Sequence, residues 1–182
     1  MIEVRFHGRG GQGVVMAAKM LAAAMLRDGL FGQAIPAFGT ERRGAPVLAS
    51  VRMDRRPIRL RCQVYHPDHL VVFDPSLLAK PQTLSGLKDD GTILVNSPVT
   101  PADKTIPDNI QSYVVDISRI AWEEGLIAGG IPMINTAVLG AFSRATGIVS
   151  LESVEKTVTE YFPAKADTNL RAIRTAYQRL GE

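Results

Sequence analysis

The stretch GRGGQG, residues 8–13, combines the glycine spacing G-x-G-x-x-G with an arginine, a pattern typical of phosphate binding. It follows the apolar residues 2–6 and precedes the alanine-rich, apolar residues 14–26. A strand–glycine–helix junction directs backbone N–H groups and the positive end of a helix dipole towards one point. Because glycine has no Cβ, an anion can approach such a backbone closely. A tight strand–helix turn that binds no ligand is the alternative interpretation.

Two common nucleotide sites do not fit this loop. NAD sites place an acidic residue about 20 residues after the glycines, where it binds the ribose hydroxyls. Residues 30–39, LFGQAIPAFG, contain no carboxylate. A P-loop ends in Gly-Lys-Ser/Thr, whereas Val14 follows Gly13 here. A stand-alone Rossmann-like protein that binds NAD or a flavin is therefore kept only as the alternative hypothesis.

Arginines supply what the glycines alone lack. Arg9 lies inside the loop, and Arg42 and Arg43 lie between two further glycines. A helix terminus contributes about 0.3–1 kcal/mol to anion binding, whereas a hydrogen bond to a charged group contributes about 1.5–3 kcal/mol. Since micromolar affinity requires about 8 kcal/mol, the loop needs these arginines and some apolar contact to hold a ligand.

A second group of arginines lies in residues 52–61. For these side chains, the preferred interpretation is a solvated surface or ion pairs with a partner. Nucleic-acid binding is a remote hypothesis, because residues 52–61 contain no aromatic side chain for base stacking. The members of this group are Arg52, Arg55, Arg56, Arg59 and Arg61.

The composition limits the class of protein. With 182 residues, 46% of them hydrophobic, the sequence predicts one globular domain spanning residues 1–182. The formal net charge of +3 is mildly basic and indicates an anionic ligand or partner, without singling out nucleic acid. A single cysteine, Cys62, excludes an internal disulfide and a Cys-ligated iron–sulfur or structural zinc site. No apolar run reaches the ~20 residues that span a bilayer, so we expect a cytoplasmic protein without a membrane span.

No catalytic residue and no metal site is predicted within the chain. The histidines His7, His66 and His69 are scattered, and no Ser–His–acid or Cys–His arrangement is visible. His7 lies beside the glycine loop, but a packed or surface histidine is the preferred interpretation. Cys62 has arginine neighbours that favour a thiolate, although a half-buried strand residue is preferred.

The periodicity predicts an α/β fold in three layers, α/β/α, with a mostly parallel or mixed central sheet. Short apolar runs at 2–6, 69–74, 91–96 and 112–117 are typical of buried strands, and a brief strand begins near residue 31. Residues 46–53 and 56–65 are expected to pair, with a turn at 54–57. Helices are expected at 14–26, 119–128, 133–146 (opened by Pro132), 151–161 and 165–180.

Two of these helices, 14–26 and 133–146, have almost no polar face. We expect each to be covered on two sides, by the sheet and by something else. If that cover comes from a partner, the isolated chain exposes apolar faces and is poorly stable.

Several segments together resemble the gamma subunit of the 2-oxoacid:acceptor oxidoreductases, the thiamine-diphosphate enzymes that act on pyruvate, 2-oxoisovalerate or arylglyoxylates. The resemblance covers nearly the whole chain in order, and the combination of GRGGQG with FG-x-ERRG is its specific part. One departure is Thr40, where many relatives have proline. The segments are VRFHGRGGQGVVMAAKMLA, GQAIPAFGTERRGAPVLASVRMDRRPIRLR, VVFDP, ILVNSP and INTAVLGAF.

The resemblance implies a role within a complex. Thiamine diphosphate and magnesium are held by the alpha and beta subunits, and iron–sulfur clusters lie in other subunits, including a ferredoxin-like delta subunit. The gamma subunit resembles a three-layer α/β domain that helps to hold coenzyme A and is not itself catalytic. The implied coenzyme A residues are Gly8, Arg9, Gly10, Gly11, Gln12, Gly13, Arg42 and Arg43, with Gln33 and Asn96 as weaker candidates at strand ends facing the same rim.

Overall fold

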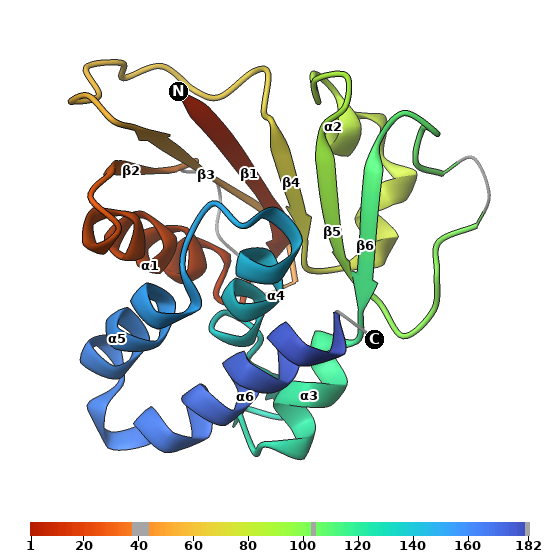
Figure 1. The fold of residues 1–182 in the computed structure, drawn as a ribbon. Helices are drawn as coiled ribbons and strands as arrows, with labels where there is room; N and C mark the ends of the chain where they lie inside the picture. Colours follow the sequence, from red (N-terminus) through yellow and green to blue (C-terminus); the bar gives the residue numbers. More distant parts are fainter. Residues whose placement is uncertain (38–43, 103–104, 181–182) are drawn as a thin grey trace.

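A six-stranded mixed sheet forms the centre of the protein (Figure 1). The computed structural model describes residues 1–37, 44–102 and 105–180. The strand order is β2-β3-β1-β4-β5-β6, in which β1, β4, β5 and β6 are parallel and β3 is antiparallel to both of its neighbours. The strands are β1 (Ile2–Arg9), β2 (Phe31–Pro36), β3 (Pro46–Asp54), β4 (His69–Val72), β5 (Thr92–Asn96) and β6 (Gln111–Val115).

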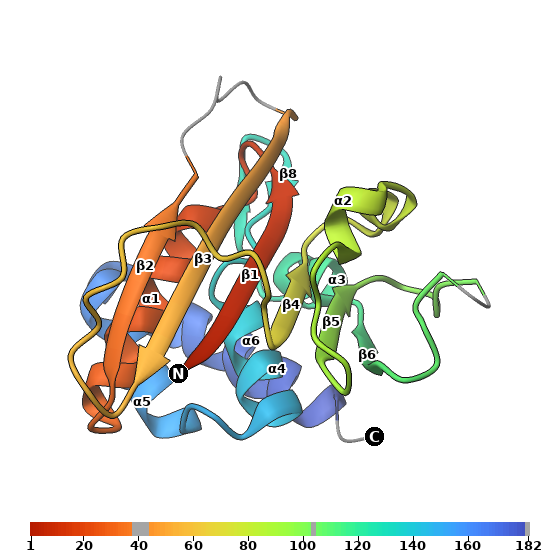
Figure 2. The same cartoon turned by 90° about the horizontal axis from the view of Figure 1, so that it is seen from above.

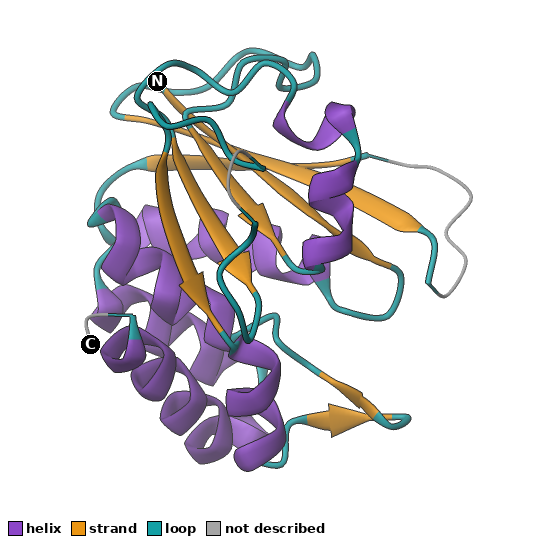
Figure 3. Cartoon of the chain, turned by 90° about the vertical axis from the view of Figure 1, so that its right-hand side faces the viewer, coloured by secondary structure: helices purple, strands orange, loops and turns teal. Residues whose placement is uncertain are grey.

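Helices cover the two faces of this sheet unequally (Figure 3). One face carries α1 (Val14–Arg27), α3 (Ile117–Glu123), α4 (Ala137–Thr146), α5 (Leu151–Tyr161), η2 (Pro163–Lys165) and α6 (Ala166–Arg179). The other face carries η1 (Pro75–Ala79), α2 (Pro81–Leu84) and irregular segments. The expected three-layer α/β class is confirmed, with one thick and one thin outer layer. None of the described helices has the length and apolarity required to cross a bilayer.

Successive side chains of β1 point to opposite faces of the sheet, and a separate apolar core lies on each face. Val4 and Phe6 are fully buried against the thick helical layer, whereas Arg5 and His7 face the thin layer. A smaller apolar core lies between η1 and the other side of β4 and β5. The members of this smaller core are Leu70, Val72, Leu77, Leu78, Ile93, Val95 and Ile110.

The two apolar helices are covered by the chain itself. α1 packs between β2–β3 and α5, and α4 packs against α6 and α5. The contact with α6 is close, since a Cβ on Gly140 would lie 2.1 Å from the carbonyl oxygen of Ile173. Burial on two sides is therefore confirmed. The expectation that these helices expose apolar faces in the isolated chain is wrong for α4 and for most of α1, because the C-terminal helices supply the second cover. Met16 and Leu26 of α1 are nevertheless exposed.

The predicted pairing of residues 46–53 with 56–65 is wrong. β3 forms as expected, but β1 occupies one of its edges and β2 the other, so no edge is left for a hairpin partner. Residues 56–65 form no strand and run irregularly along the protein. Cys62 is consequently exposed on this segment and is not a half-buried strand residue.

The boundaries around the predicted helices 119–128 and 133–146 also differ. α3 ends at Glu123, and β7 (Ile127–Ala128) and β8 (Ile131–Pro132) form a small hairpin before α4 begins at Ala137. Gly129 and Gly130 have φ values of 56° and 76°. Two successive left-handed residues are the geometry of a tight hairpin turn, so Pro132 lies in a strand and does not open the helix.

Asp28 joins the end of α1 to the start of α5. Its carboxylate accepts hydrogen bonds from the backbone N–H of Ser150 (2.7 Å), the Ser150 hydroxyl (2.7 Å) and the Ser153 hydroxyl (2.5 Å). Desolvation opposes ionisation, but the hydrogen bonds from Ser153 and Ser150 outweigh it and lower the pKa of Asp28. The carboxylate therefore fastens the helix that covers α1.

We predict that Asp28→Asn lowers the free energy of unfolding by about 1 kcal/mol at pH 7, because hydrogen bonds to a charged acceptor become neutral. Asp108→Asn is the matched control, since Asp108 is exposed and has no hydrogen bond to a described side chain. Because the folded pKa is depressed, the difference between wild type and Asp28→Asn is full at pH 7. It shrinks as the pH falls below the ordinary aspartate pKa of about 4. Urea unfolding at pH 7 and pH 3.5 measures both effects, and equal stability of wild type and Asp28→Asn at pH 7 contradicts the prediction.

Candidate functional site

The carboxyl ends of β1 and β4 lie side by side, and the chain leaves them in opposite directions. From β1 it passes through α1 to β2, and from β4 it passes through η1 on the other face to β5. Such a topological switch point opens a crevice at the carboxyl edge of a sheet, where ligands of α/β proteins bind. The backbone N–H of Phe73 donates to the carbonyl oxygen of His7 (2.7 Å) and fixes the two strand ends together. The glycine loop therefore stands at the position that the fold favours for a ligand.

The glycines of the loop are required by close packing. β1 continues to Arg9, so Gly8 lies in the strand, where a Cβ would come within 2.5 Å of Cγ2 of Val14. Gly13 has φ 81°, and a Cβ there would lie 2.7 Å from Cβ of Asn135. Strand, helix and the segment before α4 thus meet without side chains between them.

Part of the loop satisfies its own hydrogen bonds. The backbone N–H of Arg9 donates to Oε1 of Gln12 (2.7 Å), and the N–H of Gln12 donates to the carbonyl of Arg9 (3.1 Å). The N–H of Gly10 donates to the carbonyl of Ala45 (2.8 Å), next to β3. Gln12 therefore shapes the loop from within.

The rest of the loop leaves its donors open. α1 has no side-chain cap at its first residue, and its preceding residue Gly13 is left-handed. Within the described part of the chain, no acceptor meets the N–H groups of Gly11, Gly13 and the first turn, residues 14–16. Unsatisfied donors at a helix start, together with the helix dipole, favour an anion.

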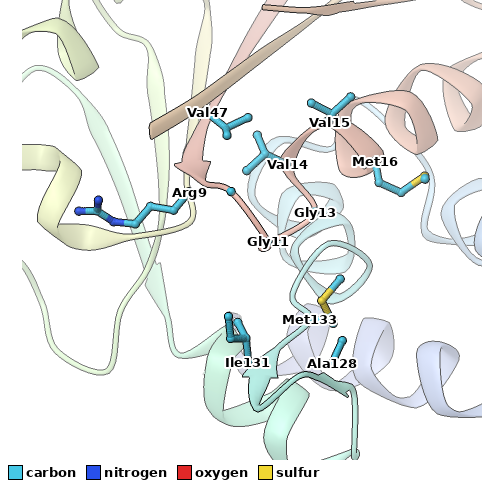
Figure 4. A pocket seen from close by; sticks show the side chains of 11 residues that line it. Arg9, Gly11, Gly13, Val14, Val15, Met16, Val47, Ala128, Ile131 and Met133 are labelled. Atoms are coloured by element: carbon cyan, nitrogen blue, oxygen red, sulfur yellow. The ribbon is translucent and has the colours of Figure 1, made fainter. Parts of the chain in front are cut away.

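These donors border a pocket of about 590 Å³ (Figure 4). The loop and the first turn of α1 form one wall, and the β7–β8 hairpin with Met133 forms the other. Apart from the loop, the lining is apolar: Val14, Val15, Met16, Val47, Ala128, Ile131 and Met133. The pocket therefore offers hydrogen-bond donors at one end and apolar walls along the rest, at a volume typical of ligand sites.

Arg9 does not extend into this pocket. Its side chain points away from Val15 and Met16 (Figure 4) and forms an ion pair with Asp74. It also donates to the hydroxyl of Ser76 (2.8 Å). Desolvation raises the pKa of Asp74, but hydrogen bonds from Ser76 and Arg9 outweigh it and lower the pKa. Arg9 thus ties the loop after β1 to the loop after β4, and its expected contact with a phosphate stays a prediction.

Asn96 lies at the carboxyl end of β5 and is almost fully buried. Its amide nitrogen donates to the carbonyl of Phe73 (2.8 Å) and to the hydroxyl of Ser118 (2.8 Å). Its Oδ1 accepts from the backbone N–H of Ser118 (3.0 Å). Asn96 therefore joins the end of β4 to the start of α3, a structural role.

Gln33 lies at the other end of the sheet, so the expectation that it shares a rim with Asn96 is wrong. It is paired with Arg52 of β3, and Arg52 is paired with Glu3 at the start of β1. β3 runs antiparallel between β2 and β1 and sets this register. Arg42 and Arg43, like Thr40, lie outside the described residues.

Asn135 is a neighbour of the glycine loop that the sequence did not reveal as a candidate. It is 6% exposed, and its Nδ2 would lie 3.2 Å from a Cβ on Gly13. The side-chain amide has no hydrogen-bond partner among the described residues. The predicted helix 133–146 placed Asn135 in its first turn, whereas Asn135 precedes the first residue of α4 and lies against the glycine loop.

His7 is a packed histidine on the thin side of the sheet. Its Nε2 accepts a hydrogen bond from Nε of Arg5 (2.9 Å), and Arg5 also donates to the carbonyls of Thr83 (3.0 Å) and Ser85 (2.6 Å). Burial, followed by the charge of Arg5, lowers the pKa of His7 to about 4. The ring is therefore neutral at pH 7 and serves as an acceptor for a buried cation.

Comparison with known proteins gives a consistent result. The family described as pyruvate ferredoxin/flavodoxin oxidoreductase matches residues 3–179. The pyruvate synthase subunit PorC of Methanothermobacter marburgensis is 47% identical, and the match covers 99% of this chain and 98% of that one. The pyruvate/ketoisovalerate oxidoreductases common subunit gamma of Pyrococcus furiosus is 46% identical, with 98% and 97% covered.

Solved structures agree with the fold. The crystal structure of pyruvate oxidoreductase subunit PORC from Thermotoga maritima has a TM-score of 0.83 at 39% identity, with 97% of this chain and 95% of that chain covered. A 2-oxoglutarate:ferredoxin oxidoreductase from Magnetococcus marinus, solved with 2-oxoglutarate, coenzyme A and succinyl-CoA, has a TM-score of 0.79 at 22% identity. That match covers 98% of this chain and 31% of the other.

The topology also weakens the stand-alone Rossmann alternative. In a dinucleotide fold the second strand lies parallel beside the first, which brings its terminal acid to the ribose. Here antiparallel β3 separates β2 from β1. β2 (Phe31–Pro36) contains no carboxylate.

The buried His7 predicts a specific loss of stability in mild acid. Because its folded pKa of about 4 lies below the ordinary value of 6.5, stability is full above pH 6.5 and falls as the pH drops towards 4. The loss attributable to His7 reaches about 3 kcal/mol. We expect His7→Gln to remove this component while retaining an acceptor for Arg5. Urea unfolding of both proteins between pH 7.5 and 4.5 measures it, and parallel pH profiles for the two proteins contradict the assignment.

Proposed function

Because the chain belongs to the family of pyruvate ferredoxin/flavodoxin oxidoreductases, we propose that its glycine loop and pocket hold coenzyme A. The chain is the gamma subunit of a 2-oxoacid:ferredoxin oxidoreductase, an enzyme acting on the oxo group of donors. In the proposed overall reaction, a 2-oxoacid and coenzyme A give an acyl-CoA, carbon dioxide, one proton and two electrons for the acceptor. Coenzyme A supplies the thiol that receives the acyl group.

The observation that carries this proposal is the set of open N–H groups beside an apolar pocket. Coenzyme A joins a pyrophosphate to a long, less polar arm, so one ligand uses both parts of the site. The N–H groups of Gly11, Gly13 and residues 14–16 suit the pyrophosphate, and the amide of Asn135 adds a neighbouring side-chain donor. The walls formed by Val47, Ile131 and Met133 suit the arm.

Charge has to be added to these neutral donors. A helix terminus contributes about 0.3–1 kcal/mol, far below the roughly 8 kcal/mol of micromolar binding. Arg42 and Arg43 remain the proposed source of guanidinium contacts. Gly8 and Gly10 contribute by allowing close packing and by fixing the loop, and Gln12 holds its shape.

The remaining chemistry is assigned to other subunits. We propose that thiamine diphosphate and magnesium are held by alpha and beta subunits and that iron–sulfur clusters are held by a ferredoxin-like delta subunit. The single cysteine of this chain cannot hold such a cluster by itself. The isolated chain is then a binding subunit without turnover, and its cytoplasmic location stays a prediction.

We predict that Asn135→Ala weakens coenzyme A binding by the assembled complex about tenfold, because a hydrogen bond to a charged group contributes roughly 1.5–3 kcal/mol. Arg42→Ala is expected to weaken it at least as much. Gln33→Ala is the control, since Gln33 lies at the far end of the sheet. Calorimetric titration with coenzyme A and the KM for coenzyme A report the effect. An unchanged affinity in both Asn135→Ala and Arg42→Ala removes the pocket from consideration.

Assembly gives an independent prediction. A tagged copy of the chain, isolated from its native host, is expected to bring along a thiamine-diphosphate subunit and a subunit rich in cysteine. The purified complex reduces a viologen dye with a 2-oxoacid and coenzyme A, whereas the chain alone does not. Recovery of a folded chain without partners, or turnover by that chain alone, contradicts the subunit assignment.

A further inference from the structure

The face of β2, β3 and β1 opposite α1 is crossed by an irregular segment, residues 55–66 (Figure 2). We call it the arginine segment. Arg52, which is 2% exposed, holds it through hydrogen bonds to the carbonyls of Cys62 (2.8 Å) and Gln63 (2.9 Å). Glu3 pairs with Arg52 at 2.7 Å and neutralises its charge. A buried ion pair therefore fixes the backbone of a segment that has no regular structure of its own.

The arginine segment concentrates the positive charge of the chain. Its four arginines are exposed, and none of their guanidinium groups has an ion pair or hydrogen bond with a described residue. The segment contains no acidic residue, and removing its four charges from the formal net charge of +3 leaves the rest of the chain at −1. These arginines are Arg55, Arg56, Arg59 and Arg61.

Apolar and aromatic side chains accompany this charge. Leu60 is 47% exposed and Tyr65 64% exposed, and Phe31 on the neighbouring β2 is 42% exposed. β2 is the edge strand of the sheet, so it lies open on one side. Arginine mixed with aromatic side chains is the composition of protein–protein interface centres, where desolvated anchors carry most of the binding energy.

We propose that the arginine segment, together with Phe31, is the docking surface for a carboxylate-rich protein surface on another subunit of the complex. This inference rests on the proposed function, which makes the chain one subunit among several. Unpaired guanidinium groups match carboxylates in paired hydrogen bonds. Because Arg52 already holds the backbone of the segment, binding has to order only the side chains. A protein suits the surface better than a nucleic acid, because Pro57, Ile58 and Leu60 interrupt the charge.

The docking surface is separate from the coenzyme A pocket. Val47, near the start of β3, lines the pocket, whereas Arg52, near its end, lies under the arginine segment. A partner bound here leaves the pocket accessible. Assembly and coenzyme A affinity are therefore expected to respond to different substitutions.

The test is charge reversal in the assembled complex. The variant Arg55→Glu/Arg59→Glu/Arg61→Glu is compared with Lys19→Glu/Lys80→Glu/Lys165→Glu, which reverses three exposed lysines elsewhere. We expect the arginine variant to retain its unfolding midpoint but to bind the partner subunits at least about tenfold more weakly, with slower association. Wild-type association should weaken as sodium chloride rises, and the lysine variant should behave like the wild type. Equal retention of partners by both variants overturns the inference while leaving the proposed function intact.

A cross-link identifies the occupant. Arg59→Lys keeps the charge and supplies an amine that a carbodiimide joins to a neighbouring carboxylate. We expect mass spectrometry of the complex to find the introduced amine at position 59 joined to an Asp or Glu of another subunit. Cross-links confined to this chain or to a second copy of it overturn the inference. The inference is also overturned if the charge-reversed variant assembles normally but no longer carries nucleic acid that the wild type binds. If even the wild-type chain retains no partner subunit, the proposed function fails as well.

Discussion

The absence of side chains at Gly8 and Gly13 is the constraint on which the site depends. A single methyl group at either position would lie within 2.7 Å of a neighbouring side chain. Strand β1 of the sheet meets helix α1 and the segment before α4 there. Gly13 immediately precedes α1 and has no side chain that could cap it, so the first turn of α1 is left uncapped, and it borders a pocket. Gly13 thus both permits the close packing and leaves the start of α1 without a side-chain cap.

The chain uses arginine in two different ways on the thin side of the sheet. Arg5 and Arg52 are buried. Arg52 is held by backbone carbonyls together with the side chains of Glu3 and Cys62. Arg5 is held by backbone carbonyls together with one side-chain partner. For Arg5 that partner is His7, which stays neutral because burial lowers its pKa. The arginines of residues 55–66 have no such partners among the described residues. Buried arginines therefore build the scaffold, and exposed arginines are left for a partner.

Local features of the fold could be predicted from the sequence, and relations between distant segments could not. The junction of β1, the glycines and α1 is encoded within about 25 consecutive residues, so its pattern identified both elements, and anion binding at the junction stays a prediction. Residues 56–65 have the composition of a strand, but both edges of β3 were already taken by strands from elsewhere. Gln33 was placed at the wrong rim because strand order determines which ends meet. Asn135 was missed since its approach to Gly13 spans more than a hundred residues.

The cover of α1 by α5 has a consequence for biosynthesis. Arg27 ends α1, whereas Leu151 begins the helix that shields it, so roughly 120 residues separate the two partners along the chain. At about 5–20 residues per second, the ribosome delivers α5 on the order of ten seconds after α1 has emerged. During that interval α1 has only the sheet, chiefly β2 and β3, and at the end of the interval α4 to pack against. A chaperone that binds apolar helices could bind α1 during this interval. A chain truncated before residue 151 would lack α5 and leave that side of α1 permanently exposed.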